Sequence, residues 1–241
     1  MERTRLPRVV TAGAAALADA LIRWSVRSHF RAVYARVLAP PSPDRAVILF
    51  ANHHSWWDGY LCYTLGRTWG MPMNLWMEEW RWFPPFWALG ALPYPTHDAN
   101  VRARTLRRTV RLLRQPPRVL FLFPEGVIHA GFHLLPFGRS LHWLAQQVPE
   151  VQLLPAAIVI SHTLHQYPRA FLHVDLPFTS PVSSPSEWLQ QAQDRIAALV
   201  ERLREEAECC DSTEKALAAG FSMLVRGKPS VHERWWAKVV P

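Results

Sequence analysis

Short, uninterrupted apolar runs recur along this 241-residue chain and divide it into segments of strand length. Ala46–Phe50, Val119–Phe123 and Leu153–Ile160 are almost entirely apolar, without the polar alternation of a half-exposed strand. Such runs are typical of strands that are covered on both faces, as in α/β sheets. Met73–Met77 and Ala170–Leu176 are further strands in this interpretation. Because helical patterns separate the runs, the sequence predicts a single α/β domain with a central mixed sheet flanked by helices.

Helical patterns also occupy both ends of the chain. Residues 1–40 combine arginines with apolar residues at helical spacing, which predicts an N-terminal amphipathic helix. Such a helix either associates with a membrane surface or packs on the core of its own domain. A proline-rich break follows it. In this division, residues 41–185 are the α/β core, and residues 186–241 are a C-terminal extension that is helical to about Val225.

The composition restricts the class of protein. Hydrophobic residues at 49% and charged residues at 19% exclude a disordered chain and a coiled coil. The formal charge is +8, and the chain contains 12 Trp. A basic, tryptophan-rich surface favours an anionic partner such as membrane lipid or the phosphates of CoA. Only the net charge and an arginine-rich helix over residues 100–114 favour nucleic acid, and no recognised binding signature accompanies them, so no nucleic-acid partner is expected.

The sequence also indicates a cellular setting. No stretch reaches the roughly 18 uncharged apolar residues of a transmembrane helix, and the longest candidate, Trp82–Thr96, is interrupted by prolines. Cys62, Cys209 and Cys210 have neither a metal spacing nor a disulfide framework, and no secretory signal is visible. We therefore expect a peripheral or monotopic protein on the cytoplasmic side of a membrane.

Polar residues follow two of the predicted strands. His53 and Asp58 come directly after the first strand, where the aspartate falls in the first turn of a helix. A carboxylate on the second ring nitrogen fixes the tautomer of a histidine and stabilises the imidazolium, as general-base histidines require. Glu125 and Gly126 lie at the end of another strand, where open α/β sheets bind ligands. Taken separately, each pattern is also compatible with a structural role, as a helix cap or an ordinary turn.

Together these motifs resemble the glycerolipid acyltransferase family, which is typified by 1-acylglycerol-3-phosphate (lysophosphatidic acid) acyltransferases. The resemblance spans roughly residues 45–180 and includes the family's first, third and fourth motifs. In this chain they read Asn52-His53-x-Ser55-x-x-Asp58, Phe123-Pro124-Glu125-Gly126 and Leu154-Pro155-Ala156-Ala157-Ile158.

The resemblance implies a reaction and a set of partners. His53 removes the proton of an acceptor hydroxyl as it attacks the thioester of acyl-CoA or acyl-carrier protein, and Asp58 orients His53. The leaving thiol has a pKa near 8.5, so no strong general acid is needed. Glu125 and Gly126 line the acceptor site, and Asn52 is a further candidate for substrate binding. The thioester is a co-substrate, a membrane lipid is the acceptor, and neither a metal nor another cofactor is expected.

The chain departs from the family pattern where the family holds the acceptor's phosphate. The segment that matches the second motif, Gly90–Thr96, lacks the family's arginine. This departure favours an acceptor other than lysophosphatidic acid. The alternative is that Arg139, or else Arg102 or Arg104, supplies the cation from another direction. The Trp/Pro segment over residues 80–95 is either an acyl-chain channel or part of the core.

Two other functions stay open at this point. A non-catalytic membrane- or lipid-binding protein on the same scaffold would use the basic N-terminal helix and the tryptophans equally well, although it would not need the His53–Asp58 pair. A hydrolase would use His53 to activate water in place of a lipid hydroxyl.

Overall fold

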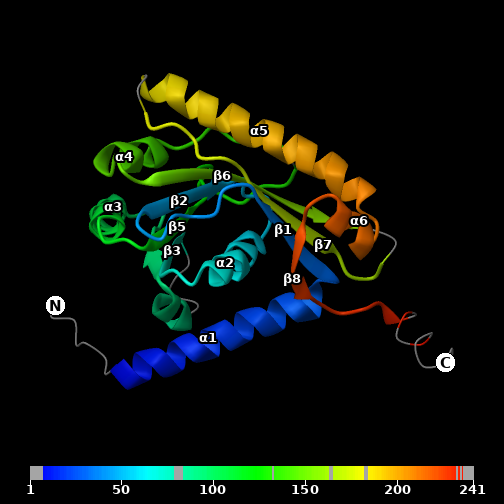
Figure 1. Ribbon diagram of the computed structural model, residues 1–241. Helices are drawn as coiled ribbons and strands as arrows, with labels where there is room; N and C mark the ends of the chain where they lie inside the picture. The colour runs from blue at the N-terminus through cyan, green and yellow to red at the C-terminus, as the bar shows by residue number, and fades with distance from the viewer. Residues whose placement is uncertain are drawn as a thin grey trace.

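An eight-stranded mixed sheet lies between two layers of helices (Figure 1). The computed structural model describes residues 8–78, 84–131, 133–162, 165–181, 184–231, 233 and 235. The strand order is β4-β3-β5-β2-β6-β7-β1-β8. This arrangement confirms the predicted fold class, a single α/β domain with a mixed central sheet and flanking helices.

The strands that carry the two polar motifs are neighbours in the parallel part of the sheet. β2 pairs in parallel with β5 and with β6, and β3 pairs in parallel with β4 and β5. β7 is antiparallel to β6, and β8 is antiparallel to β1. The carboxyl ends of β2, β3, β4 and β5 therefore meet at one edge, where open sheets bind ligands. The strands are β1 (Ala32–Val37), β2 (Ala46–Ala51), β3 (Met73–Met77), β4 (Ala91–Pro93), β5 (Arg118–Leu122), β6 (Gln152–Ser161), β7 (Arg169–Val174) and β8 (Ser222–Arg226).

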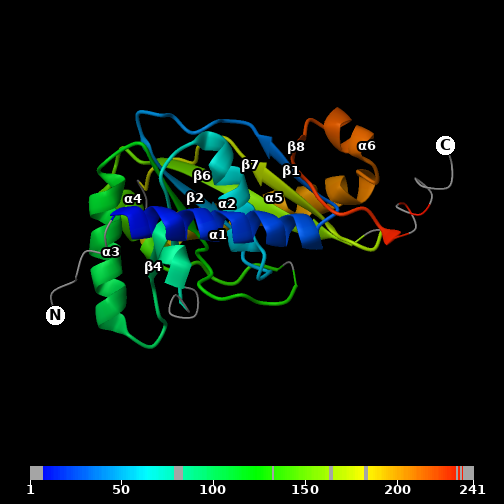
Figure 2. The same cartoon turned by 90° about the horizontal axis from the view of Figure 1, so that it is seen from below.

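Two hydrophobic clusters, one on each face of the sheet, hold the helices in place. α1 and α2 pack on one face, and α3, α4, α5 and α6 contribute to the cluster on the other. In Figure 1, α5 lies above the sheet and α1 crosses below it, and Figure 2 shows α1 from below. The helices are α1 (Arg8–His29), α2 (Asp58–Trp69), the 3-10 helix η1 (Pro84–Leu89), α3 (Ala99–Leu113), α4 (Ser140–Gln147), α5 (Pro185–Cys209) and α6 (Thr213–Ala218).

The burial of β2 explains its continuous apolar sequence. Val47 and Leu49 pack in the cluster under α1 and α2, whereas Ile48 and Phe50 pack in the opposite cluster. Successive side chains point to opposite faces of a strand, so a strand covered on both faces requires an apolar residue at every position.

The N-terminal helix is shorter than its pattern predicts. Residues 26, 30, 33 and 37 have helical spacing, but α1 ends at His29 and Ala32–Val37 form β1. β1 is inserted between β7 and β8, and residues 32–35 are buried there. The burial gained from two neighbouring strands therefore overrides the local helical period, and this part of the helix prediction was wrong.

Two further differences occur near the C-terminus and in the Trp/Pro segment. The C-terminal helical pattern to about Val225 is broken after α6, because Gly220 adopts a left-handed conformation (φ +84°) and Ser222–Arg226 pair with β1. Residues 84–89 form η1 and residues 91–93 form β4, while residues 80–83 lie outside the described part of the chain. Among the described helices, none combines the length and the apolar character needed to cross a bilayer.

Candidate active site

A buried carboxylate organises the turn between β2 and α2. Asp58 Oδ2 accepts a hydrogen bond from His53 Nδ1 at 2.9 Å. The same oxygen accepts the backbone N–H groups of His54 and Ser55, each at 2.9 Å. One oxygen thus fixes the backbone of the turn and the direction of the His53 ring, and the predicted contact between His53 and Asp58 is present.

The His53 ring is held on a second side and is partly exposed. It stacks on Phe123, which follows β5, with ring centroids 4.1 Å apart and an angle of 12° between the planes. The side chain is 17% exposed and lines the large cavity described below. Because Nδ1 donates to a carboxylate, the ring proton belongs on Nδ1, and Nε2 keeps the lone pair that can accept a proton.

Glu125 ties the loop after β5 to the His53 turn. Its Oε1 accepts the backbone N–H of His53 at 2.7 Å. Its Oε2 accepts His129 Nε2 at 2.5 Å and the backbone N–H of Leu135 at 2.8 Å. Gly126 turns the chain immediately afterwards with a φ of +75°, a conformation that favours glycine. Both oxygens of the buried Glu125 side chain are therefore engaged within the protein.

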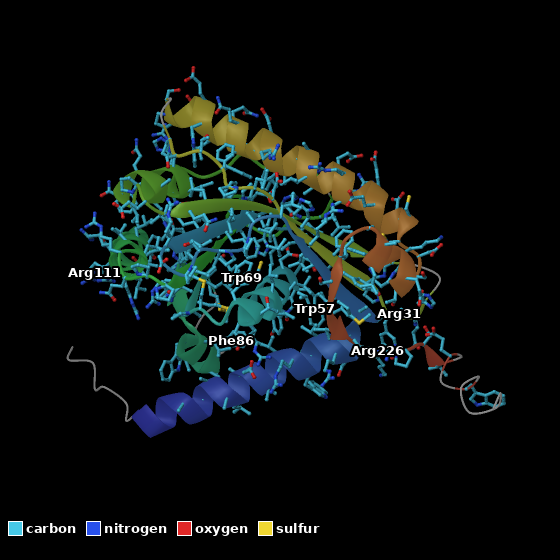
Figure 3. The ribbon with its side chains drawn as sticks, in the orientation of Figure 1. Arg31, Trp57, Trp69, Phe86, Arg111 and Arg226 are labelled. Atoms are coloured by element: carbon cyan, nitrogen blue, oxygen red, sulfur yellow. The ribbon has the colours of Figure 1, made fainter. Side chains whose placement is uncertain are left out.

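A cavity of about 990 Å³ opens beside His53, Glu125 and Gly126. This volume lies at the upper end of the range for small-molecule pockets. Phe86 of η1, labelled in Figure 3, contributes to its wall near α1. Most of the other lining residues are apolar or aromatic, including Ile22, Tyr63, Met73, Leu75 and Leu89 on the α1/α2 side of the sheet and Trp76, Leu106 and Trp143 on the α3/α4 side. Such a cavity suits a long hydrocarbon chain.

Comparison with known proteins identifies the family. The family model described as Acyltransferase matches residues 25–159, which is more than half of the chain and includes both polar motifs. The chain belongs to the acyltransferase family. This confirms the family expected from the motifs, and the protein is an acyltransferase enzyme.

The fold of this acyltransferase is also shared with a solved structure. The crystal structure of the 1-acyl-sn-glycerophosphate (LPA) acyltransferase PlsC from Thermotoga maritima superposes with a TM-score of 0.56 and 21% sequence identity. The alignment covers 84% of this chain and 83% of that chain. No curated protein matches the sequence significantly.

Asn52 takes a different place in the acyltransferase from the one expected for a substrate-binding residue. Its side-chain oxygen accepts the backbone N–H of Ile158 at 2.8 Å, and its Nδ2 donates to the carbonyl of Ile158 at 2.9 Å. Nδ2 also lies 2.7 Å from His54 Nδ1. Burial lowers the pKa of His54, and the nearby Asp58 partly opposes that effect. Asn52 therefore joins β2 to β6 and supports the turn, and it is not among the residues that line the cavity.

The segment that matches the second motif, Gly90–Thr96, contains no arginine, and its last residue bonds a carboxylate on the cavity wall. Gly90 begins it with a φ of +95°, and a Cβ there would lie 1.9 Å from the carbonyl oxygen of Met73. Only glycine allows this close approach. Further along, the backbone N–H of Thr96 donates to Glu78 Oε1 at 3.2 Å, and the Thr96 hydroxyl donates to the same oxygen. Glu78 itself lines the cavity.

The three arginines considered as replacements lie in different places. Arg102 donates to the carbonyls of Pro95 and Thr96 and so stabilises the loop before α3. Arg104 lines a separate groove. Arg139, which precedes α4, is the one of the three that lines the cavity beside His53, called the catalytic cavity below. Arg139 therefore lines the same cavity as Glu125 and Gly126, whereas Arg102 and Arg104 are directed elsewhere.

Two functional candidates, His129 and Trp143, are not among the predicted site residues. His129 holds Glu125 Oε2, and its backbone N–H donates to the carbonyl of His53 at 3.4 Å. The available signal was its position four residues after Glu125, in the segment that departs from the family pattern. Trp143 lines the cavity and lies within the predicted helix over residues 138–147. In that helix, local sequence does not distinguish an apolar residue that lines a cavity from one that packs in the core.

Proposed function

We propose that this acyltransferase moves a fatty acyl group from a thioester donor, acyl-CoA or acyl-carrier protein, to the hydroxyl of a lipid. The observation that carries the proposal is the His53–Asp58 pair, joined at 2.9 Å, in which His53 lines a large and mainly apolar cavity. A positioned general base contributes about 100- to 10,000-fold to a rate. The cavity provides room for the acyl chain beside that base.

In the proposed reaction, His53 Nε2 accepts the proton of the acceptor hydroxyl while the oxygen forms a bond to the thioester carbonyl carbon. The carbon–sulfur bond then breaks, and the sulfur leaves with the proton that His53 carried. Asp58 stabilises the charged ring between these steps. Glu125 acts through the backbone of His53, because its two oxygens hold that turn and the loop that follows β5. The reaction uses the thioester as its source of energy and needs no cofactor.

We further propose that the preferred acceptor is an uncharged or phosphodiester-type hydroxyl lipid, such as a glycolipid sugar, a hydroxylated terpenoid or a lysophospholipid. A phosphomonoester is best held by the fork of an arginine. Here Glu78 lies on the cavity wall near Thr96, and a carboxylate repels a doubly charged phosphate. Among the described lining residues, Arg139 is the arginine on the cavity wall, and it is exposed.

A side-by-side acceptor panel with palmitoyl-CoA tests this preference. We expect a lysophospholipid or a glycolipid to give a higher kcat/KM than lysophosphatidic acid. The opposite order, combined with a selective rise in the KM for lysophosphatidic acid in Arg139→Gln, would contradict the proposed acceptor and assign the phosphate to Arg139. Release of free fatty acid without transfer to any acceptor would instead indicate a hydrolase.

The outer face of α1 supports a location on a membrane surface. Leu17, Leu21 and Trp24 lie at helical spacing and are exposed, with Trp24 64% accessible. Ile22 and Val26 on the opposite face are buried in the core. An interfacial helix has this combination of apolar face, tryptophan and flanking arginines. We propose that α1 lies on the cytoplasmic surface of a membrane, a setting in which unpaired cysteines persist.

A further inference from the structure

A second groove lies next to the catalytic cavity, between α3 and α4. Its volume is about 940 Å³. Figure 3 shows Arg111 directed outward from α3 on this flank of the molecule. The apolar part of the wall includes Val101, Val110 and Trp143, and the basic part consists of Arg104, Arg107, Arg108, Arg111 and Arg114.

Three of the groove's arginines have no carboxylate partner in the described part of the chain. Within the described ranges, Arg104, Arg107 and Arg111 form no ion pair with a carboxylate. Arg114 donates to the backbone carbonyl of Gln147 at 3.0 Å, which leaves its charge in place. Like charges three and four positions apart repel one another along a helix. An anion bound in the groove would therefore stabilise α3.

The groove and the catalytic cavity share a wall. Trp143 of α4 lines both. On α3, Leu106 lines the catalytic cavity, and the next residue, Arg107, lines the groove. An extended molecule that enters the catalytic cavity past Trp143 would therefore have its other end among the arginines.

We propose that this groove binds the phosphate-bearing nucleotide of a coenzyme A thioester, an inference that rests on the acyl transfer proposed above. Guanidinium groups match phosphate geometry and stack on aromatic faces. From Arg104 to Arg114 the helix rises by about 15 Å, enough to contact more than one phosphate. A concave groove of about 940 Å³ suits a small molecule better than the surface of a carrier protein. The assignment favours acyl-CoA as the donor.

Direct binding tests the groove independently of catalysis. Adenosine 3′,5′-bisphosphate, which carries the nucleotide and 3′-phosphate of CoA, is titrated into the full chain by calorimetry at fixed ionic strength. We expect the double variant Arg107→Gln/Arg111→Gln to weaken binding at least tenfold, because two charge-assisted contacts are lost. The matched control, Arg202→Gln/Arg226→Gln, removes the same charge elsewhere, and Arg226 lies on the opposite flank in Figure 3. Equal affinities in the two double variants would overturn the proposal.

Kinetics with different donors identify the occupant. For the Arg107/Arg111 variant, we measure the fold loss in kcat/KM relative to the wild type with each donor. We expect this loss to be at least tenfold greater with palmitoyl-CoA than with palmitoyl-pantetheine, which lacks the nucleotide. A defect confined to palmitoyl-carrier protein would assign the groove to that protein, and a defect confined to anionic vesicles would assign it to the membrane. Either result contradicts the proposal. If the wild type transfers acyl groups from none of these donors, the proposed function fails, and the binding titration still decides the groove.

Discussion

At the scale of single residues, two buried carboxylates position one histidine. Asp58 orients the ring, and Glu125 holds the backbone N–H of the same residue. The sequence pattern indicated the His53–Asp58 pair, because a histidine and an aspartate on either side of a strand-to-helix turn can form the hydrogen bond that a general-base histidine requires. It also indicated Glu125, which follows a second predicted strand. It could not indicate that both Glu125 oxygens are engaged, since one partner is His129 and the other is the backbone of Leu135.

Exchanging the Asp58 carboxylate for an amide separates its two effects. In Asp58→Asn, an amide oxygen at the Oδ2 position can still accept the N–H groups of His54, Ser55 and the His53 ring, but the negative charge that stabilises the protonated ring is lost. We expect a loss of about 100- to 10,000-fold in kcat with a nearly unchanged melting temperature. Asp58→Ala should lose activity and also melt at a lower temperature, because it leaves buried donors without an acceptor. Near-normal turnover in Asp58→Asn would show that the charge of the carboxylate does not assist the base.

Glu125→Gln distinguishes a positioning role from a direct role in acceptor binding. The amide has a single acceptor oxygen, so it cannot satisfy both the His53 turn and the loop after β5. We expect kcat to fall about tenfold or more, because a His53 ring that is held less firmly is a less effective base. The KM of the acceptor should change little. Steady-state kinetics over a range of acceptor concentrations measures both values. A large rise in the acceptor KM with kcat preserved would indicate that Glu125 contacts the acceptor directly.

At the scale of helices and strands, five of the strands were predictable from local sequence, whereas β1, β4 and β8 were not. β2, β3, β5, β6 and β7 occur within two residues of their predicted positions, because each is a short and mainly apolar run. β1 was predicted as helix, since Val33 and Val37 continue the period of α1 and no glycine or proline separates them. β8 follows Gly220, a recognisable helix-stop signal, but its partner β1 is distant in the sequence.

The role of α1 is best tested by substitutions on its outer face. A deletion of residues 1–38 would also remove β1, which belongs to the sheet. We expect Leu17→Asn/Leu21→Asn/Trp24→Asn to move much of the protein from the membrane pellet to the supernatant in a vesicle-sedimentation assay. Each exposed side chain contributes on the order of 1 kcal/mol or more of apolar burial at an interface. The control Leu176→Asn/Leu217→Asn changes exposed leucines on other elements and should sediment like the wild type. Unchanged sedimentation of the α1 variant would exclude α1 as the contact.

At the scale of the whole molecule, the site is assembled by the order of the strands. His53 and Glu125 are more than seventy residues apart, and they meet because β2 and β5 are neighbours whose carboxyl ends share one edge. Local sequence cannot provide that order. Local sequence also does not show which cavity an arginine lines. In the structure, Arg139 lines the catalytic cavity and Arg104 lines a separate groove.

A buried histidine in β7 makes the stability of the whole molecule depend on pH. His173 of β7 is buried, and Arg36 Nε donates to its Nδ1 at 2.9 Å. Burial, followed by the charge of Arg36, lowers the pKa of His173 to about 4. In the unfolded chain this pKa is about 6.5. Between these values the unfolded chain binds a proton that the folded chain does not, so the free energy of unfolding falls as the pH decreases from about 6.5 to 4.

Urea unfolding at pH 7 and at pH 4.5 measures this contribution. We expect His173 to account for about 2 kcal/mol of the loss, after allowance for screening by solvent. His173→Gln keeps an acceptor for Arg36 but cannot be protonated, so its stability should depend less on pH in this interval. The control His97→Gln removes an exposed histidine and should behave like the wild type. An identical pH dependence in all three proteins would contradict the assignment to His173.

The most direct test of the central claim is the turnover of His53→Ala in a purified acyl-transfer assay with palmitoyl-CoA and the best acceptor of the panel. His53 Nε2 is the proposed base, and the small side chain leaves the Asp58 and Glu125 carboxylates and the cavity in place. The account predicts a loss of at least about 100-fold in kcat, greater than that of Asp58→Ala, in a protein with a native circular dichroism spectrum. Near-normal turnover by the folded His53→Ala protein would show that His53 is not the general base.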